Sequence, residues 1–117
     1  MTLERLYSIL NTVLEGKVFY GVNTYDNEQN AEMPYIVYQE ISSRPIGYHD
    51  DQPIFYAATI QITLVTKRKT PAIEKLLEKT LLENKLNYSL TSEFRNTDRS
   101  VNRVYEIKNS EEIINEQ

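Results

Sequence analysis

The chain has 117 residues, carries 13 Lys+Arg against 17 Asp+Glu for a formal net charge of −4, and contains no cysteine. A single domain of this size can bury a core of its own, and the lack of cysteine excludes a disulfide scaffold, a zinc ribbon and a thiol nucleophile. The acidic balance argues against readout of nucleic acid, and the absence of a signal-peptide or membrane-span pattern predicts a cytosolic chain with no membrane partner.

Residues 3–16 predict a one-sided helix of about four turns that ends at Gly16. The apolar positions that define its stripe are Leu3, Leu6, Tyr7, Leu10, Val13 and Leu14. Residues 18–20 then predict a short strand. The turn-rich stretch over residues 23–30 predicts an exposed loop.

Two strands are predicted next, joined by a long polar connection. Residues 35–41 are rich in β-branched and aromatic side chains, which favours a strand opened by Pro34. Residues 42–53 contain Pro45 and Gly47 and predict a polar loop, a type of segment that often carries contacts. Residues 54–65 alternate apolar and mixed side chains, which predicts a long central antiparallel strand with one face on the core.

The remainder predicts a second helix and two strands. Thr70 is a natural N-cap, Pro71 suits the first helical position, and an apolar stripe follows to residue 82. Residues 86–90 predict a weaker strand, 93–100 a polar turn and 101–107 a last strand. The element order predicts an α+β domain over residues 1–108, a mainly antiparallel sheet with two helices on one face, followed by a polar tail at 109–117.

The sequence offers little for catalysis or cofactor binding. His49 is the only histidine; with Asp50, Asp51 and Glu40 it could form a carboxylate metal site, but adjacent aspartates in a turn more often cap backbone amides. Glycine-rich phosphate loops and hydrolase motifs are absent. We therefore expect no enzyme, no cofactor and no metal, and the alternative of a small enzyme using His49 stays open.

Candidate contact residues lie in polar segments. The chain has nine tyrosines against three phenylalanines, and this excess indicates surface that becomes buried only on assembly. Tyr7, Tyr56 and Tyr105 fall on apolar stripes and are expected in the core or at its edge, whereas Tyr25 and Tyr48 are expected in loops. The protein-contact candidates are Tyr25, Ser43, Arg44, Tyr48, His49, Asp50, Asp51, Lys67, Arg68 and Lys69.

In element order, the chain resembles the tail-completion, or tail-terminator, proteins of long-tailed bacteriophages and prophages of Gram-positive bacteria. The resemblance rests on the strand opening at residues 33–38, the loop at 42–53, the strand at 56–66 with the helix at 70–82, and the closing residues 103–107. It implies a structural virion protein, assembled in the bacterial cytoplasm, that forms a ring, commonly a hexamer, at the head–tail joint. Its implied partners are itself, the tail-tube protein and the head connector.

Two further hypotheses stay open beside that resemblance. Head-completion and minor tail proteins share much of this pattern, so another head–tail joining component is one alternative. A small cytosolic module that binds a ligand or peptide on its sheet face or loop is the other.

Overall fold

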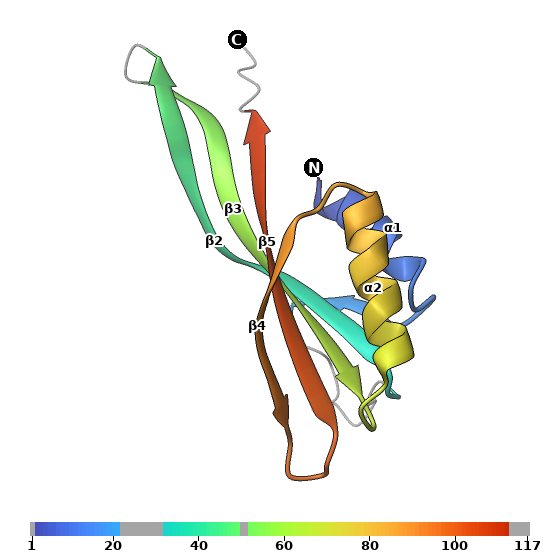
Figure 1. Cartoon of the computed structure of the whole chain (residues 1–117). Coiled ribbons are helices and arrows are strands. Elements are labelled where there is room, and N and C mark those ends of the chain that lie inside the picture. The colour runs from blue at the N-terminus through green and yellow to red at the C-terminus, as the bar shows by residue number, and fades with distance from the viewer. Residues whose placement is uncertain (1, 22–31, 50–51, 113–117) are drawn as a thin grey trace.

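The structure, a computed structural model, describes residues 2–21, 32–49 and 52–112; at 46–49, 52–56 and 109–112 only the backbone is considered. Two helices and five strands follow in chain order (Figure 1). They are α1 (Leu3–Asn11), β1 (Val18–Tyr20), β2 (Tyr35–His49), β3 (Gln52–Thr66), α2 (Pro71–Glu83), β4 (Tyr88–Arg95) and β5 (Val101–Glu112).

The five strands form one sheet in the order β1-β2-β3-β5-β4, in which β1 runs parallel to β2 and the other neighbours are antiparallel. Both helices lie side by side on one face of this sheet (Figure 1). The fold is therefore the α+β architecture that the sequence predicts, and β3 is its central strand.

The core lies between the helices and the sheet. Alternate residues of β3 supply its floor, and Leu6 and Leu10 of α1 and Leu77 and Leu81 of α2 cover it. The buried strand residues are Val18, Ile36, Tyr38, Ile60, Ile62, Leu64, Tyr105 and Ile107. The predicted alternation of the long strand is thus confirmed over the residues whose side chains are described.

The helix ends differ in detail from the expectation. α1 stops at Asn11 because Thr12 forms its C-cap, with the Thr12 hydroxyl donating to the Ile9 carbonyl at 2.6 Å. The turn that follows reaches Gly16, whose φ of +76° suits glycine. At α2, Pro71 is the first helical residue as predicted, but Thr70 makes no side-chain cap.

The segment at residues 42–53 is not the polar loop that the sequence predicts. β2 and β3 pair continuously outward to His49 and Gln52. Beyond Tyr38, β2 has no described strand on its other side, so Pro45 sits in an edge strand, where its missing N–H is tolerated. β5 likewise continues to Glu112 and takes up the first residues of the predicted polar tail.

We predict that Leu81→Ala lowers the free energy of unfolding by about 2–5 kcal/mol, because Leu81 is fully buried and its truncation leaves a cavity under α2. Leu82→Ala is the matched control, since Leu82 is 54% exposed on the same helix. Urea unfolding followed by circular dichroism measures both. Equal losses for the two variants would contradict this placement of α2.

Candidate functional site

The outer halves of three strands project beyond the helix-covered body (Figure 1). We call this projection the arm: residues 41–49 of β2, 52–59 of β3 and 108–112 of β5. In it β3 pairs with β2 from Thr59 to Gln52 and with β5 from Thr59 to Phe55. A β-bulge between Glu40 and Ser42 marks the base of the arm, and such bulges bend a strand. Every described side chain of β2 from Glu40 to Pro45 is exposed. The molecule accordingly measures 53 × 32 × 23 Å.

A polar hollow of about 320 Å³ lies on the arm. Its lining residues are Ser42, Ser43, Arg44, Ala57, Ala58, Thr59 and Lys108. The Lys108 ammonium donates to the Thr59 hydroxyl at 3.4 Å. Neither Arg44 nor Lys108 forms an ion pair with any residue in the described part of the chain. The hollow therefore presents two cations that are not neutralised there.

A second concavity, which we call the tyrosine groove, lies between α1 and the β1 edge of the sheet. It has a volume of about 410 Å³ and is lined by Leu3, Glu4, Tyr7, Ser8, Tyr20 and Tyr38. The rings of Tyr20 and Tyr38 meet edge to face with centroids 5.1 Å apart. Burial, with smaller contributions from Tyr20 and Tyr7, raises the pKa of Tyr38. Glu4 is the one acidic residue among the residues that line the groove.

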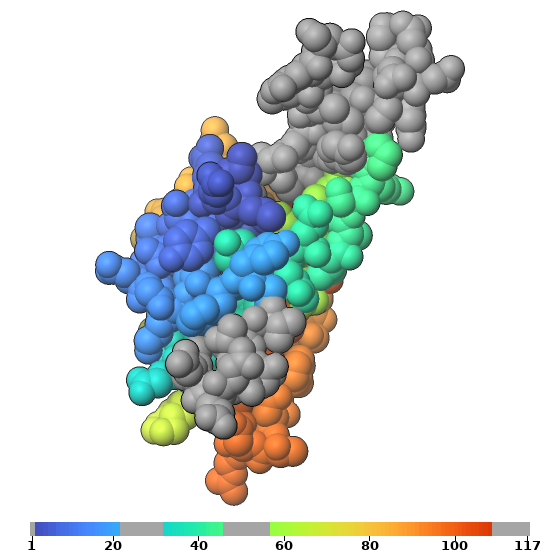
Figure 2. Space-filling model, turned by 180° about the vertical axis from the view of Figure 1, so that it is seen from behind, coloured from blue at the N-terminus to red at the C-terminus, as the bar shows by residue number. Residues whose placement is uncertain are grey.

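The groove places Tyr7 at the edge of the core rather than inside it. Tyr7 is 40% exposed because α1 lies beside β1 (Figure 2), which has only three residues, and no other described strand covers that side of the helix. Tyr105 is fully buried as predicted. The side chain of Tyr56 lies outside the described residues.

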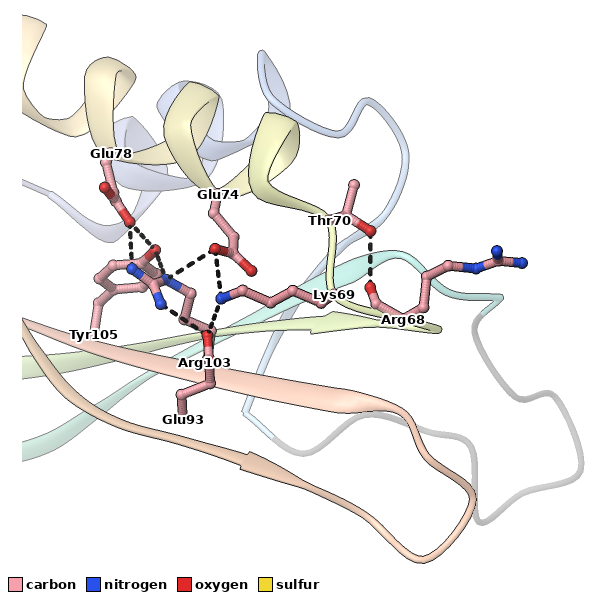
Figure 3. A network of polar contacts seen from close by, with 8 residues as sticks. All are labelled: Arg68, Lys69, Thr70, Glu74, Glu78, Glu93, Arg103 and Tyr105. Carbon is pink, nitrogen blue, oxygen red and sulfur yellow. Dashed lines mark hydrogen bonds and ion pairs between the residues drawn. The ribbon is translucent and has the colours of Figure 1, made fainter.

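An ion network joins α2 to β4 and β5 (Figure 3). Arg103 pairs with Glu78 at 2.9 Å and Glu93 at 2.7 Å, and the Tyr105 hydroxyl donates to Glu78 at 2.6 Å. Lys69 bridges Glu93 at 2.6 Å and Glu74 at 2.9 Å. These contacts connect the helix to the strand pair through charge-assisted hydrogen bonds.

The electrostatics of this network suit a structural role. Burial disfavours ionisation of Glu78, but hydrogen bonds from Tyr105 and Arg103 outweigh it and hold the pKa of Glu78 below its ordinary value of 4.5. Hydrogen bonds from Lys69 and Arg103 lower the pKa of Glu93. Burial, and then the bond to Glu78, raise the pKa of Tyr105, so its hydroxyl stays protonated near neutrality. Glu78, Glu93 and Tyr105 therefore do not exchange a proton near pH 7.

The sequence-predicted contact residues do not lie together in one site. Ser43 and Arg44 line the hollow of the arm, and Lys69 belongs to the ion network. Lys67 and Arg68 are exposed in the turn before α2, and Figure 3 shows Arg68 pointing away from the network. The others are Tyr25, Asp50 and Asp51, which lie outside the described residues, and Tyr48 and His49, whose backbone lies at the outer end of β2.

Sequence reasoning missed the ion network and the tyrosine groove. Glu74 and Glu78 are one helical turn apart on α2, and Arg103 takes a core-facing place in the alternation of β5. A charged side chain at a core-facing position needs a partner of opposite charge, so the position of Arg103 in the alternation could have predicted an ion pair. The groove had no such signal, since it depends on how α1 lies against β1.

No protein-family model matches this chain, and comparison with curated proteins gives no match. The described helices include none that is long and apolar enough to cross a membrane. No cluster of metal-ligating side chains occurs within the residues that the structure describes.

We predict that Glu78→Gln destabilises the protein near pH 7 and flattens its acid dependence. Because the pKa of Glu78 is lower in the folded chain than in the unfolded one, its stabilisation is complete above about pH 4.5 and is lost as the pH falls through the folded value. Urea unfolding between about pH 7 and pH 3 measures this.

Glu83→Gln is the matched control, because Glu83 is exposed at the end of the same helix. It should keep the acid dependence of the natural chain. If Glu78→Gln and the natural chain lose stability in parallel on acidification, the ion network does not contribute as described.

Proposed function

We propose that this protein is a structural virion component that assembles as a ring, caps the tail tube of a long-tailed bacteriophage and helps to join the tail to the head connector. It acts at the head–tail joint after assembly in the bacterial cytoplasm. The proposal joins the resemblance in element order to one structural observation, the projecting arm. It assigns the protein to binding surfaces and to no catalytic residue.

The arm is suited to assembly because its strands expose side chains to solvent and are not covered by the helices. Its strands leave the region covered by α1 and α2, and the described part of β2 beyond the bulge is exposed on every residue, including Ile41 at 43%. Beyond Tyr38, the outer edge of β2 has no described strand beside it, and an open edge of this kind is a template for pairing with another chain. The arm is therefore the best-supported contact surface.

The two lateral edges of the sheet are unlike each other. β1 is short and carries the tyrosine groove, whereas β4 is long and exposes Leu90 and Phe94. A head-to-tail contact requires two different patches on each subunit, and such contacts close into rings when the rotation allows it. The two different edges, together with an arm that projects from one end of the sheet, favour a head-to-tail ring over a symmetric dimer.

A second candidate function is peptide binding in the tyrosine groove. The groove is lined by aromatic residues and has a volume of about 410 Å³, and extended peptides commonly bind in aromatic-lined grooves. In this case the protein would remain a monomer or dimer and bind its peptide through Tyr7 and Tyr20. Another head–tail joining or minor tail component remains the alternative nearest to the proposal.

We predict that the purified chain, alone or with tail tubes of its own phage, forms a closed oligomer several times the mass of 13.7 kDa. Mass photometry over a concentration series, with and without tubes, measures it. A protein that stays monomeric or dimeric under both conditions would contradict the ring and favour the peptide-binding module.

We also predict that deleting the gene in the phage or prophage that encodes it leaves tails of uncontrolled length, or finished tails and full heads unjoined. Electron microscopy of induced lysates shows this directly. Complementation with the natural chain is the control, and normal infectious particles from the deletion strain would refute the assignment.

A further inference from the structure

The tyrosine groove carries one carboxylate and has no cation to match it. Glu4 lies in the first turn of α1 beside Tyr7, and it forms no ion pair within the described residues. Tyr7 and Tyr20 are 40% and 53% exposed. A carboxylate beside accessible tyrosine rings suits a guanidinium, which pairs with the former and stacks on the latter.

The arm presents the complementary group. Arg44 is exposed and lies opposite Ala57 in the pairing of β2 with β3, and Lys108 is its neighbour across the hollow. Neither cation has a described acidic partner. Arginine and tyrosine are also the residues most enriched at the centres of protein interfaces.

The two sites lie on opposite faces of the sheet. Tyr38 and Tyr20 share the helix-covered face with the core. Ala57 and Thr59 alternate with the buried Ala58 and Ile60, so Arg44, which is paired with Ala57, belongs to the other face. Because the sites do not overlap, one subunit can use both at once with two different neighbours.

We propose that the tyrosine groove of one subunit receives Arg44 from the arm of the next copy, with the guanidinium paired to Glu4 and stacked against Tyr7 and Tyr20. This inference rests on the proposed ring and names the contact that builds it. The occupant is a second copy because Arg44 and Lys108, which form no ion pair within the described residues, complement Glu4, which forms none there either.

Paired cysteine variants test the contact without ambiguity, since the natural chain has no cysteine. Glu4→Cys is made in a subunit carrying a mass tag and Arg44→Cys in an untagged subunit, and the mixture is treated with a short bis-maleimide. We expect the crosslinked species to join one tagged to one untagged subunit. Glu15→Cys, exposed beyond the end of α1, replaces Glu4→Cys in the control mixture and should give a background yield.

Charge reversal supplies the second measurement. Glu4→Arg and Arg44→Glu should each reduce the oligomer fraction at least tenfold at a fixed concentration, and the double variant should recover most of it. Lys75→Glu, a reversal at an exposed position of α2 outside the candidate contact residues, is the control and should assemble normally. Circular dichroism melts confirm that each variant is folded before its mass is read.

The outcomes separate this contact from the ring itself. If the natural chain forms the ring but the Glu4→Cys and Arg44→Cys mixture gives only the background crosslink, or the single charge reversals assemble normally, the contact is overturned and the proposed function stands. A natural chain that never oligomerises overturns both. Crosslinks between like subunits only would show a symmetric dimer and overturn the head-to-tail contact.

Discussion

The structure depends on one continuous strand, β3, that is paired on both sides along most of its length. Its inner half supplies Ile60, Ile62 and Leu64 to the core under the helices, and its outer half runs on into the arm. Because the ladder between β3 and β5 runs through both regions without a register shift, the arm is held in a fixed direction relative to the body. A surface on the arm can then be presented to a neighbour without the entropy cost of ordering a loop.

The ion network fixes α2 to β5 of the same sheet, and to β4 beside it. Burial of Leu77 and Leu81 brings α2 onto the sheet, but apolar contacts are non-directional and do not set its rotation. The bonds from Glu78 to Arg103 and Tyr105 do so, since charge-assisted hydrogen bonds are demanding in geometry. The Oε2 atom of Glu74 has no hydrogen-bond partner among the described residues, so the network carries a local cost.

The sequence predicted the features that follow from periodicity. The alternation of β3 and the helical stripes led to the α+β class, the element order and most of the core, because burial on one face dictates those patterns. The long β2–β3 hairpin was missed because Pro45 and Gly47 are typical of loops. An edge strand tolerates both, and its status as an edge depends on how far β1 extends, which local sequence does not encode.

Two residues, Arg44 and Tyr7, show that local sequence does not reveal the edge of the sheet. Arg44 was selected from its place in a supposed loop, and it lies on an exposed surface for a different reason, namely that it belongs to a projecting edge strand. Tyr7 was predicted in the core or at its edge because it falls on the apolar stripe of α1, and it lies at the edge because β1, the described strand beside it, is short. The exposure of both residues depends on where the sheet ends. The side-chain pattern within a single helix or strand does not determine that.

That boundary also constrains what the proposed contact can build. The groove at the β1 edge and the cation on the opposite face of the arm are different patches. When the groove of one subunit binds the arm of another, the pair still has one free groove and one free arm. Association then continues until the last free groove meets the first free arm. The number of subunits at closure follows from the angle between groove and arm, and the unbroken pairing of β3 holds that angle constant from one subunit to the next.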